Sequence, residues 1–233
     1  MNPQFLIIAG PNGAGKSVYG HFHVPKGTSI FNGDLVFAEL KRQYPDIETD
    51  RLAGGVAVAL EKARDNALAA KSNFAFESNF SNDLAIDITR MFRDAGYEIT
   101  LVYFGLNDLE SSAIRVDTRV QLGGHDVPLE ILRYNMEEGI RRVTEHLPVF
   151  DRIYFADTSV KGLAPVIAYC NKETAKYELL DNKIEWFNNN FKEPLYKLSL
   201  IHQDLQVKKP KENIPSIQPE QDEDNEQNHH RKL

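Results

Sequence analysis

The sequence predicts an α/β protein, a three-layer sandwich in which helices cover both faces of a parallel sheet. Two observations predict this class. Short apolar runs, each the length of one strand, alternate along the chain with longer segments whose apolar residues recur at helical spacing. The first apolar run also leads straight into a glycine-rich turn. Strands that alternate with helices join into parallel sheets through right-handed crossovers.

Five segments are predicted as strands of this sheet. The run at 5–9 is continuously apolar up to Gly10, which is typical of a parallel strand buried on both faces. The run at 99–106 is the most apolar of the chain, so we expect it at the centre of the sheet. The other expected strands are 29–31, 73–76 and 152–156.

Helices are expected between these strands. One begins near Gly15 and another near Leu35. The segment 52–71 is rich in Ala and Leu at helical spacing. The segment 81–95 is predicted to be a helix with Ser81 as its N-cap and Gly96 just after its end. Its expected apolar stripe is Leu84, Ile88, Met91 and Phe92.

Two further features complete the predicted domain, which spans residues 1–207. A long polar helix should start at Pro128 and run to about His146. The segment from Val166 to Leu180 indicates a small hairpin added after the fifth strand. The polar tail at 208–233 holds few aliphatic residues and is expected to be disordered, because it cannot bury enough apolar surface to offset its ordering entropy.

Composition excludes several functional classes. The chain of 233 residues carries a net charge of −7, so non-specific binding to nucleic acid or to an anionic membrane is not expected. Cys170 is the only cysteine, which excludes a disulfide framework and a cysteine-rich zinc site. The first residues lack the pattern of a signal peptide, and no run approaches the length of a membrane-spanning helix. We therefore expect a cytoplasmic protein.

The segment from Gly10 to Ser17 matches the phosphate-binding pattern G-x-x-x-x-G-K-[ST] at every specified position, between a predicted strand and a predicted helix. Its backbone N–H groups are expected to bind the phosphates of ATP or GTP. Lys16 would reach the β- and γ-phosphates, and the Ser17 hydroxyl would bind Mg²⁺. The residues assigned to this nucleotide site are Gly10, Pro11, Asn12, Gly13, Ala14, Gly15, Lys16 and Ser17.

Two large classes of proteins with this loop do not fit the rest of the chain. GTPases need a D-x-x-G segment and a base-reading N-K-x-D segment. The chain has no glycine three residues after an aspartate, and its nearest approach to the second motif, at 182–185, ends in glutamate. The segment 121–125 lacks the serine and the glutamine of the transporter ATPase signature.

Acidic and polar residues after the second and third strands are candidates for binding a phosphate acceptor. Asp34 can accept the proton of an attacking hydroxyl or hold a water on Mg²⁺, and it can also cap the following helix. Glu77, with Ser78 and Asn79, can hydrogen-bond a polyhydroxyl substrate, or it can be a plain surface strand end. Parallel sheets bring such strand ends to one edge, next to the bound nucleotide.

Arginines in the segment 115–133 are candidates for contacts to the transferring phosphate. Arg115 and Arg119 share one helical face, and Arg133 lies on the helix after a Gly-Gly turn. Two helices joined in this way can form a helical lid that brings guanidinium groups onto the phosphates and excludes water. A solvated basic helix is the alternative for these residues.

Asp157 and Trp186 could each have a functional or a structural role. Asp157 ends the fifth strand and resembles a Walker B carboxylate, although it comes late in the chain and can equally cap the next segment. Trp186 and the adjacent Phe187 are expected in the core rather than stacked on a nucleobase. Neither residue is assigned to the site.

Over about residues 4–190 the chain resembles the zeta-toxin family of P-loop kinases. The resemblance rests on the loop 10–17, Asn-Gly-Asp at 32–34, Phe-Glu-Ser at 76–78 and the arginine block with Gly-Gly-His-Asp-Val-Pro at 115–133. It implies phosphorylation of a sugar hydroxyl of UDP-N-acetylglucosamine with ATP or GTP. It also implies specific roles: Lys16 and Ser17 bind phosphate and Mg²⁺, Asp34 is the base, Glu77 binds substrate, and Arg119 and Arg133 clamp the phosphates.

The chain also departs from the family. Ser78 stands where members often carry threonine, and the chain starts directly at its first strand, without the segment that helps plasmid-borne members to dock a helical antitoxin. An antitoxin partner is therefore not a firm expectation, and a housekeeping kinase for a small molecule is an equal alternative. A regulatory ATPase with no acceptor and a kinase for polynucleotide ends remain as further hypotheses.

Overall fold

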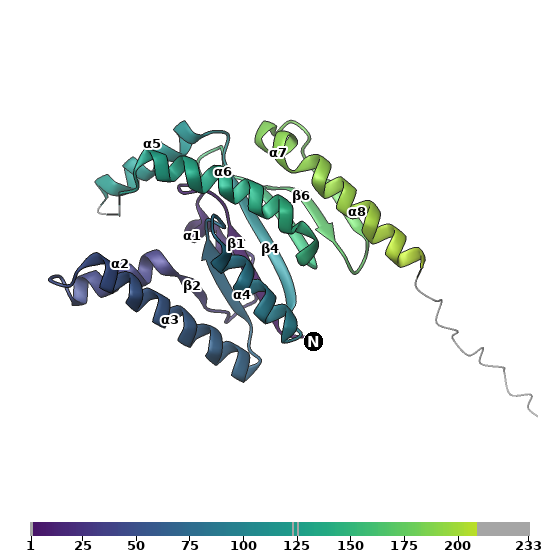
Figure 1. Cartoon of the computed structure of the whole chain (residues 1–233). Coiled ribbons are helices and arrows are strands. Elements are labelled where there is room, and N and C mark those ends of the chain that lie inside the picture. The colour runs from purple at the N-terminus through teal and green to yellow at the C-terminus, as the bar shows by residue number, and fades with distance from the viewer. Residues whose placement is uncertain (1, 123, 125, 209–233) are drawn as a thin grey trace, which may run out of the picture.

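The structure, a computed structural model, describes residues 2–122, 124 and 126–208 (Figure 1). Its strands form one sheet in the order β2-β3-β1-β4-β5-β6-β7. The strands are β1 (Gln4–Ala9), β2 (Ile30–Asn32), β3 (Phe74–Ser78), β4 (Glu98–Gly105), β5 (Arg152–Asp157), β6 (Val166–Asn171) and β7 (Lys176–Leu179). The helices are α1 (Lys16–Tyr19), α2 (Gly33–Gln43), α3 (Thr49–Ala70), α4 (Asp83–Asp94), α5 (Leu109–Gln121), α6 (Leu129–His146), α7 (Glu185–Asn190) and α8 (Lys192–Val207).

Strands β1 to β5 run parallel, as the alternation of strands and helices predicts. Strand β1 lies between β3 and β4, with Ile8 level with Glu77 on one side and Val102 on the other. Strand β6 pairs antiparallel with β5, and β7 pairs antiparallel with β6, which confirms the predicted hairpin. The carboxyl ends of the five parallel strands therefore share one edge of the sheet.

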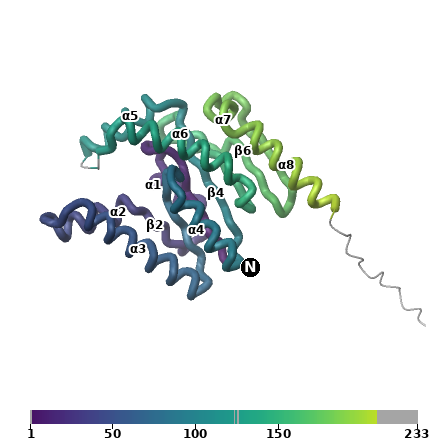
Figure 2. The backbone as a smooth tube through the Cα atoms, in the orientation of Figure 1, coloured from purple at the N-terminus to yellow at the C-terminus, as the bar shows by residue number. Residues whose placement is uncertain are grey.

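The core lies on both faces of the sheet, but more heavily on one of them. Alternate side chains of β1 point to opposite faces. Phe5 and Ile7 join the larger cluster, which takes in residues of α3, α4, α6, α7 and α8, whereas Leu6 and Ile8 join a smaller one. Figure 2 shows α4 and α6 lying across the sheet on the more heavily covered side.

Helix α4 differs in detail from the prediction. It begins at Asp83 with Asn82 as N-cap, so Ser81 is not its cap. Ile88 and Phe92 are buried, but Leu84 and Met91 are nearly half exposed. The reason is the position of the buried stripe, which runs through Ala85, Ile88 and Thr89 and leaves Leu84 and Met91 at its margins. Gly96 follows the helix with φ +83°, as expected for a left-handed residue after a helix end.

The C-terminal helix α8 was not among the predicted elements. Its buried residues Leu195, Leu198, Ser199 and His202 recur at helical spacing, a signal that is weak because two of the four are polar. The predicted disordered tail starts at its end and lies, apart from Lys208, outside the described residues. Among the described residues, no helix is both long enough and apolar enough to cross a bilayer.

Candidate active site

The glycine-rich loop between β1 and α1 packs against the neighbouring elements so closely that side chains would not fit. Gly10 has φ +140°, and a Cβ there would lie 2.2 Å from the Phe104 carbonyl oxygen of β4. Gly13 has φ +75°, and its Cβ would lie 3.0 Å from the Ser112 carbonyl oxygen of α5. Glycine is required where the chain combines such angles with close backbone approach. The predicted helix does begin here, but α1 has four residues before a 3₁₀ turn, Gly20–Phe22.

Lys16 is buried although it carries a charge. Its Nζ donates to the Gly10 and Pro11 carbonyl oxygens at 2.8 and 3.0 Å and to Asn79 Oδ1 at 2.8 Å. Burial lowers its pKa to about 8, while the Glu77 and Asp34 carboxylates oppose this shift and the Arg119 guanidinium adds to it. The ammonium is therefore held between the two loops that follow β1 and β3, near groups of both charges.

Nucleotide affinity is expected to fall as the pH rises above about 8. A bound phosphate favours the protonated form of Lys16, whose pKa in the free protein is about 8. The last ionisation of a phosphate group lies at about 6 and does not interfere. Affinity should be level below pH 8 and weaken by up to about tenfold per pH unit above it. Isothermal titration of ATP from pH 7 to pH 9.5 checks this; a constant affinity in a folded protein would contradict it.

Glu77 and Ser17 are joined by a hydrogen-bond network that contains Asn32. Ser17 Oγ donates to Glu77 Oε1 at 2.9 Å, and Asn32 Nδ2 lies 2.8 Å from Glu77 Oε2 and 3.1 Å from Ser17 Oγ. Burial raises the pKa of Glu77, and its contacts with Lys16, Ser17 and Asn32 oppose that shift. The predicted substrate-side glutamate thus sits directly beside the predicted metal-binding hydroxyl.

Asn32, which was not singled out from the sequence, takes the helix-capping role that was one alternative for Asp34. Asn32 is the N-cap of α2, because its Oδ1 accepts hydrogen bonds from the backbone N–H groups of Asp34 and Leu35 at 2.9 and 3.2 Å. Asp34 therefore does not cap the helix, and its carboxylate is available to the site. The Asn-Gly-Asp order places a favoured N-cap residue two positions before Asp34, which was the available signal.

Replacing Asn32 separates its capping role from its network role. Serine is about as good an N-cap as asparagine, but its hydroxyl is too short to reach Glu77 as well. We expect Asn32→Ala to unfold at lower denaturant concentration than Asn32→Ser, by about 1 kcal/mol in the free energy of unfolding. Denaturant unfolding of both variants measures this. Equal stability of the two would show that the side chain does not act as the cap.

A cavity of about 180 Å³ opens beside Lys16 at the carboxyl edge of the sheet. Its polar lining includes Asp34, Glu77, Ser78 and Asn79, so the structure brings together the residues predicted to bind an acceptor. Ser78 Oγ also accepts a hydrogen bond from the Phe80 N–H at 2.9 Å. The apolar lining is Phe31, Val56, Leu60, Phe76 and Leu84.

The three candidate arginines occupy different environments. Arg115 donates to the Thr158 and Ser159 carbonyl oxygens at 2.6 and 3.0 Å and so is tied into the fold. Arg119 lies one helical turn further along α5, close enough to Lys16 to lower the pKa of that ammonium. Arg133 is exposed in the first turns of α6. Gly123 and His125 of the expected turn lie outside the described residues.

Asp157 is engaged by neighbouring residues at the end of β5. Its Oδ1 accepts hydrogen bonds from the Trp186 indole N–H at 2.8 Å and from Ser159 Oγ at 2.7 Å. It also accepts from the Ser159 backbone N–H, which agrees with the capping interpretation of this residue. Trp186 and Phe187 are buried, as expected for core residues.

Solved structures share this fold at low sequence identity. The AvrRxo1-ORF1:ORF2 complex in its native form has a chain with a TM-score of 0.62 and 13% identity, which covers 81% of this chain; the present chain spans 63% of its length. The same complex with ATP gives a TM-score of 0.59 and 15% identity. A chain of the PezAT toxin–antitoxin system of Streptococcus pneumoniae gives a TM-score of 0.53 and 16% identity, with coverage of 87% and 85%.

Sequence comparison adds little to this. No protein-family model matches the chain. An uncharacterised protein of Haemophilus influenzae is 27% identical over 134 residues, which are 58% of this chain and 93% of the relative. The chain thus shares its α/β fold with these structures, and its glycine-rich loop lies at the end of β1.

Proposed function

We propose that the chain is an ATP- or GTP-dependent, Mg²⁺-dependent phosphotransferase that transfers the γ-phosphate to a hydroxyl of a small molecule. One observation carries the proposal: the cavity lined by Asp34 and Glu77 opens directly beside Lys16 of the phosphate loop. A phosphate donor on one side and a carboxylate-lined acceptor site on the other is the arrangement that phosphoryl transfer to a hydroxyl requires. The AvrRxo1 complex with ATP, which shares the fold, supports nucleotide binding here.

The residues present fit a nucleotide and its metal ion. Close packing at Gly10 and Gly13 holds the loop in a tight curl in which backbone N–H groups can bind phosphates, and Ser17 offers a hydroxyl to Mg²⁺. Among the described residues no cluster of three or more His, Cys, Asp or Glu is placed to hold a metal, so phosphate oxygens would complete its ligands. When bound, Mg²⁺ neutralises charge on the β- and γ-phosphates.

The protein's own groups would act mainly by position and charge. Lys16 binds the phosphates, and Asp34 orients the acceptor hydroxyl and takes its proton. Glu77, Ser78 and Asn79 hold the acceptor. Arg119 and Arg133 stabilise the charge on the transferring group. Arg119 lies near Lys16, and Arg133 is exposed on α6.

We further propose that the acceptor is a nucleotide sugar such as UDP-N-acetylglucosamine. The cavity pairs carboxylates with apolar side chains, among them Phe31, Phe76 and Leu60. A sugar ring presents hydroxyls at its edge and C–H groups on its faces, so a lining of both kinds suits it. The resemblance to zeta toxins over residues 4–190 supports the same acceptor class.

Mass spectrometry tests the proposal. The protein is incubated with ATP, Mg²⁺ and a panel of nucleotide sugars, and each acceptor is examined for a gain of one phosphate. Asp34→Asn serves as the inactive control. Transfer to a nucleotide sugar supports the proposal, whereas ATP hydrolysis with no phosphorylated product favours a regulatory ATPase.

A polynucleotide-end kinase is the second candidate. A chain of the Pnkp1/Rnl/Hen1 RNA repair complex has a TM-score of 0.51 and 18% identity, with coverage of 61% of this chain and 46% of that chain. The net charge of −7 argues against extended contacts to a phosphate backbone, but a single strand end needs few of them. An oligonucleotide with a free 5′-hydroxyl therefore belongs in the same panel.

A protein partner is a separate proposal. Two structures that share the fold contain partner proteins. The PezAT structure comes from a toxin–antitoxin system, and the AvrRxo1 structure is a complex of AvrRxo1-ORF1 with AvrRxo1-ORF2. By analogy, an antitoxin-like protein would bind this chain and block its site. Growth arrest on expression of the wild-type chain, but not of Asp34→Asn, would support a toxin that such a partner has to hold inactive.

A further inference from the structure

Two loops that form the site leave the sheet at the same level. Ala9 of β1 and Ser78 of β3 are paired, and this pair is the last one of the ladder between the two strands. Asn12 and Ser81 each lie three residues further on. Beyond this last pair no strand pairing among the described residues fixes the distance between the phosphate loop and residues 79–81, here called the acceptor segment, so side-chain contacts must hold it.

Asn135 of α6 joins these two loops. Its Nδ2 donates to Asn12 Oδ1 at 2.9 Å, and its Oδ1 accepts from Ser81 Oγ at 2.7 Å. Both ends of one amide are thus used, one on each loop. Asn12 and Ser81 are each 8% exposed, so this hydrogen-bond chain is largely shielded from water.

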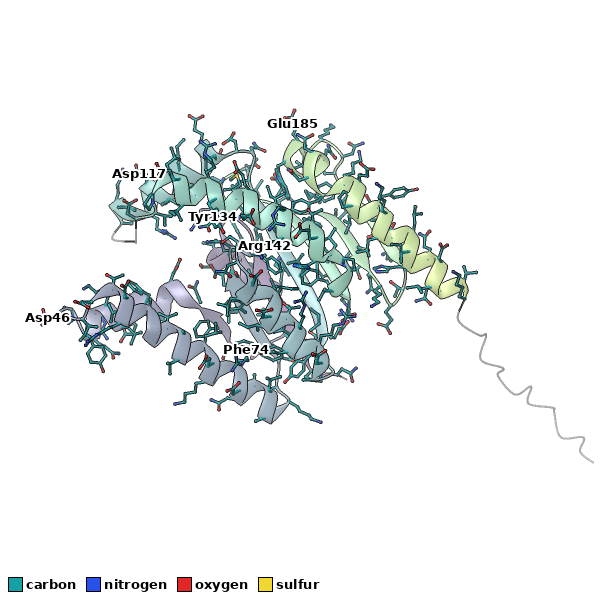
Figure 3. The ribbon with its side chains drawn as sticks, in the orientation of Figure 1. Asp46, Phe74, Asp117, Tyr134, Arg142 and Glu185 are labelled. Carbon is teal, nitrogen blue, oxygen red and sulfur yellow. The ribbon has the colours of Figure 1, made fainter. Side chains whose placement is uncertain are left out.

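The helix is also seated directly on the acceptor segment. Gly139, one turn after Asn135, packs so closely that a Cβ there would lie 2.6 Å from the Asn79 carbonyl oxygen. Further along, Arg142 forms an ion pair with Asp83 of α4. Figure 3 shows Tyr134 and Arg142 on the side of α6 that faces α4. Helix α6 is therefore fixed against this part of the fold along about two turns.

The segment that α6 covers has an unusual backbone. Phe80 is fully buried and has φ +60°, a left-handed conformation that is uncommon for a bulky residue. Such a conformation persists when its surroundings hold it. The contacts of Asn135 and Gly139 lie on either side of Phe80, at Ser81 and Asn79.

We propose that Asn135 and Gly139 are positioning residues that hold the acceptor segment at a fixed distance from the phosphate loop. The inference rests on the proposed phosphotransferase function, since the distance matters where donor and acceptor meet. A displacement of about 1 Å between reacting groups can cost about 10²-fold in rate. Helix α6 thus has a role that is separate from the phosphate contact predicted for Arg133 from the sequence.

Two variants with matched controls test the proposal. Asn135→Ala removes the bridge, and Gly139→Ala inserts a methyl group against the Asn79 carbonyl. Glu137→Ala, at an exposed position of the same helix, and Gly54→Ala, at a helical glycine with open space around its Cβ, are the controls. We expect the two test variants to lower kcat by about 10–100-fold with KM for ATP changed less than about threefold, and the controls to match the wild type.

Coupling and hydrogen exchange complete the test. Ser81→Ala combined with Asn135→Ala should be no slower than the slower single variant, because both remove one chain of contacts. Amide exchange across residues 78–84 should be faster in Asn135→Ala and Gly139→Ala than in the controls. Unchanged kcat or unchanged exchange in the test variants overturns the proposal. A wild type that phosphorylates no acceptor overturns the proposed function instead, and the exchange measurement then still decides whether α6 holds the segment.

Discussion

Replacing Lys16 with alanine is expected to abolish nearly all phosphotransfer and to weaken nucleotide binding. The Lys16 ammonium is buried, is held by three acceptors and lies beside the Asp34 and Glu77 carboxylates. A charge-assisted hydrogen bond contributes about 1.5–3 kcal/mol, so ATP affinity should fall by about 10–100-fold. Loss of one charged donor to the transferring group should lower turnover by about 10²–10³-fold.

The control for this variant is Lys26→Ala, which removes the same charge at an exposed position. Isothermal titration gives the affinity, and transfer to the acceptor found by mass spectrometry gives the turnover. Circular dichroism shows whether the variant is folded. A folded Lys16→Ala protein with near-normal ATP affinity and turnover would contradict the assignment of the phosphate loop.

The part of the site that lies within short sequence segments could be predicted. The loop 10–17 is defined by local spacing, and its glycines meet angles and close contacts that are specific to glycine. The parallel order of β1 to β5 follows from alternation of strands and helices. The meeting of strand ends in a parallel sheet predicts Asp34 and Glu77 at one edge, and in the structure both line the same cavity.

The connections between distant segments could not be predicted. Asn32, Asn135 and Arg115 act through contacts to residues 15 to 123 positions away, and single polar residues leave no periodic pattern in a sequence. Arg115 fits the motif of a phosphate ligand as well as Arg119 does, yet it is held by the carbonyl groups of Thr158 and Ser159. Local spacing places both arginines on one face of α5 but does not show which backbone groups lie opposite.

Asp34→Asn is expected to leave nucleotide affinity nearly unchanged and to lower turnover by about 10²-fold or more, the range of general-base effects. The substitution keeps the size of the side chain and removes its ability to take a proton. Because Asn32 caps α2 through the backbone N–H groups of residues 34 and 35, the start of the helix does not depend on the Asp34 carboxylate. The variant should therefore fold as the wild type does.

The result separates a base from the other groups of the cavity. Glu77 is hydrogen-bonded to Ser17 and Asn32, so Glu77→Gln should disturb the network around the Ser17 hydroxyl and raise the Mg²⁺ concentration needed for half-maximal rate. In Asp34→Asn that concentration should stay as in the wild type while kcat falls, because in the proposed mechanism the Asp34 carboxylate acts on the acceptor hydroxyl and not on the Mg²⁺ site. Rates measured over a Mg²⁺ series distinguish the two variants. If Asp34→Asn needs more Mg²⁺ and regains full kcat at saturation, Asp34 holds the metal's water and is not the base.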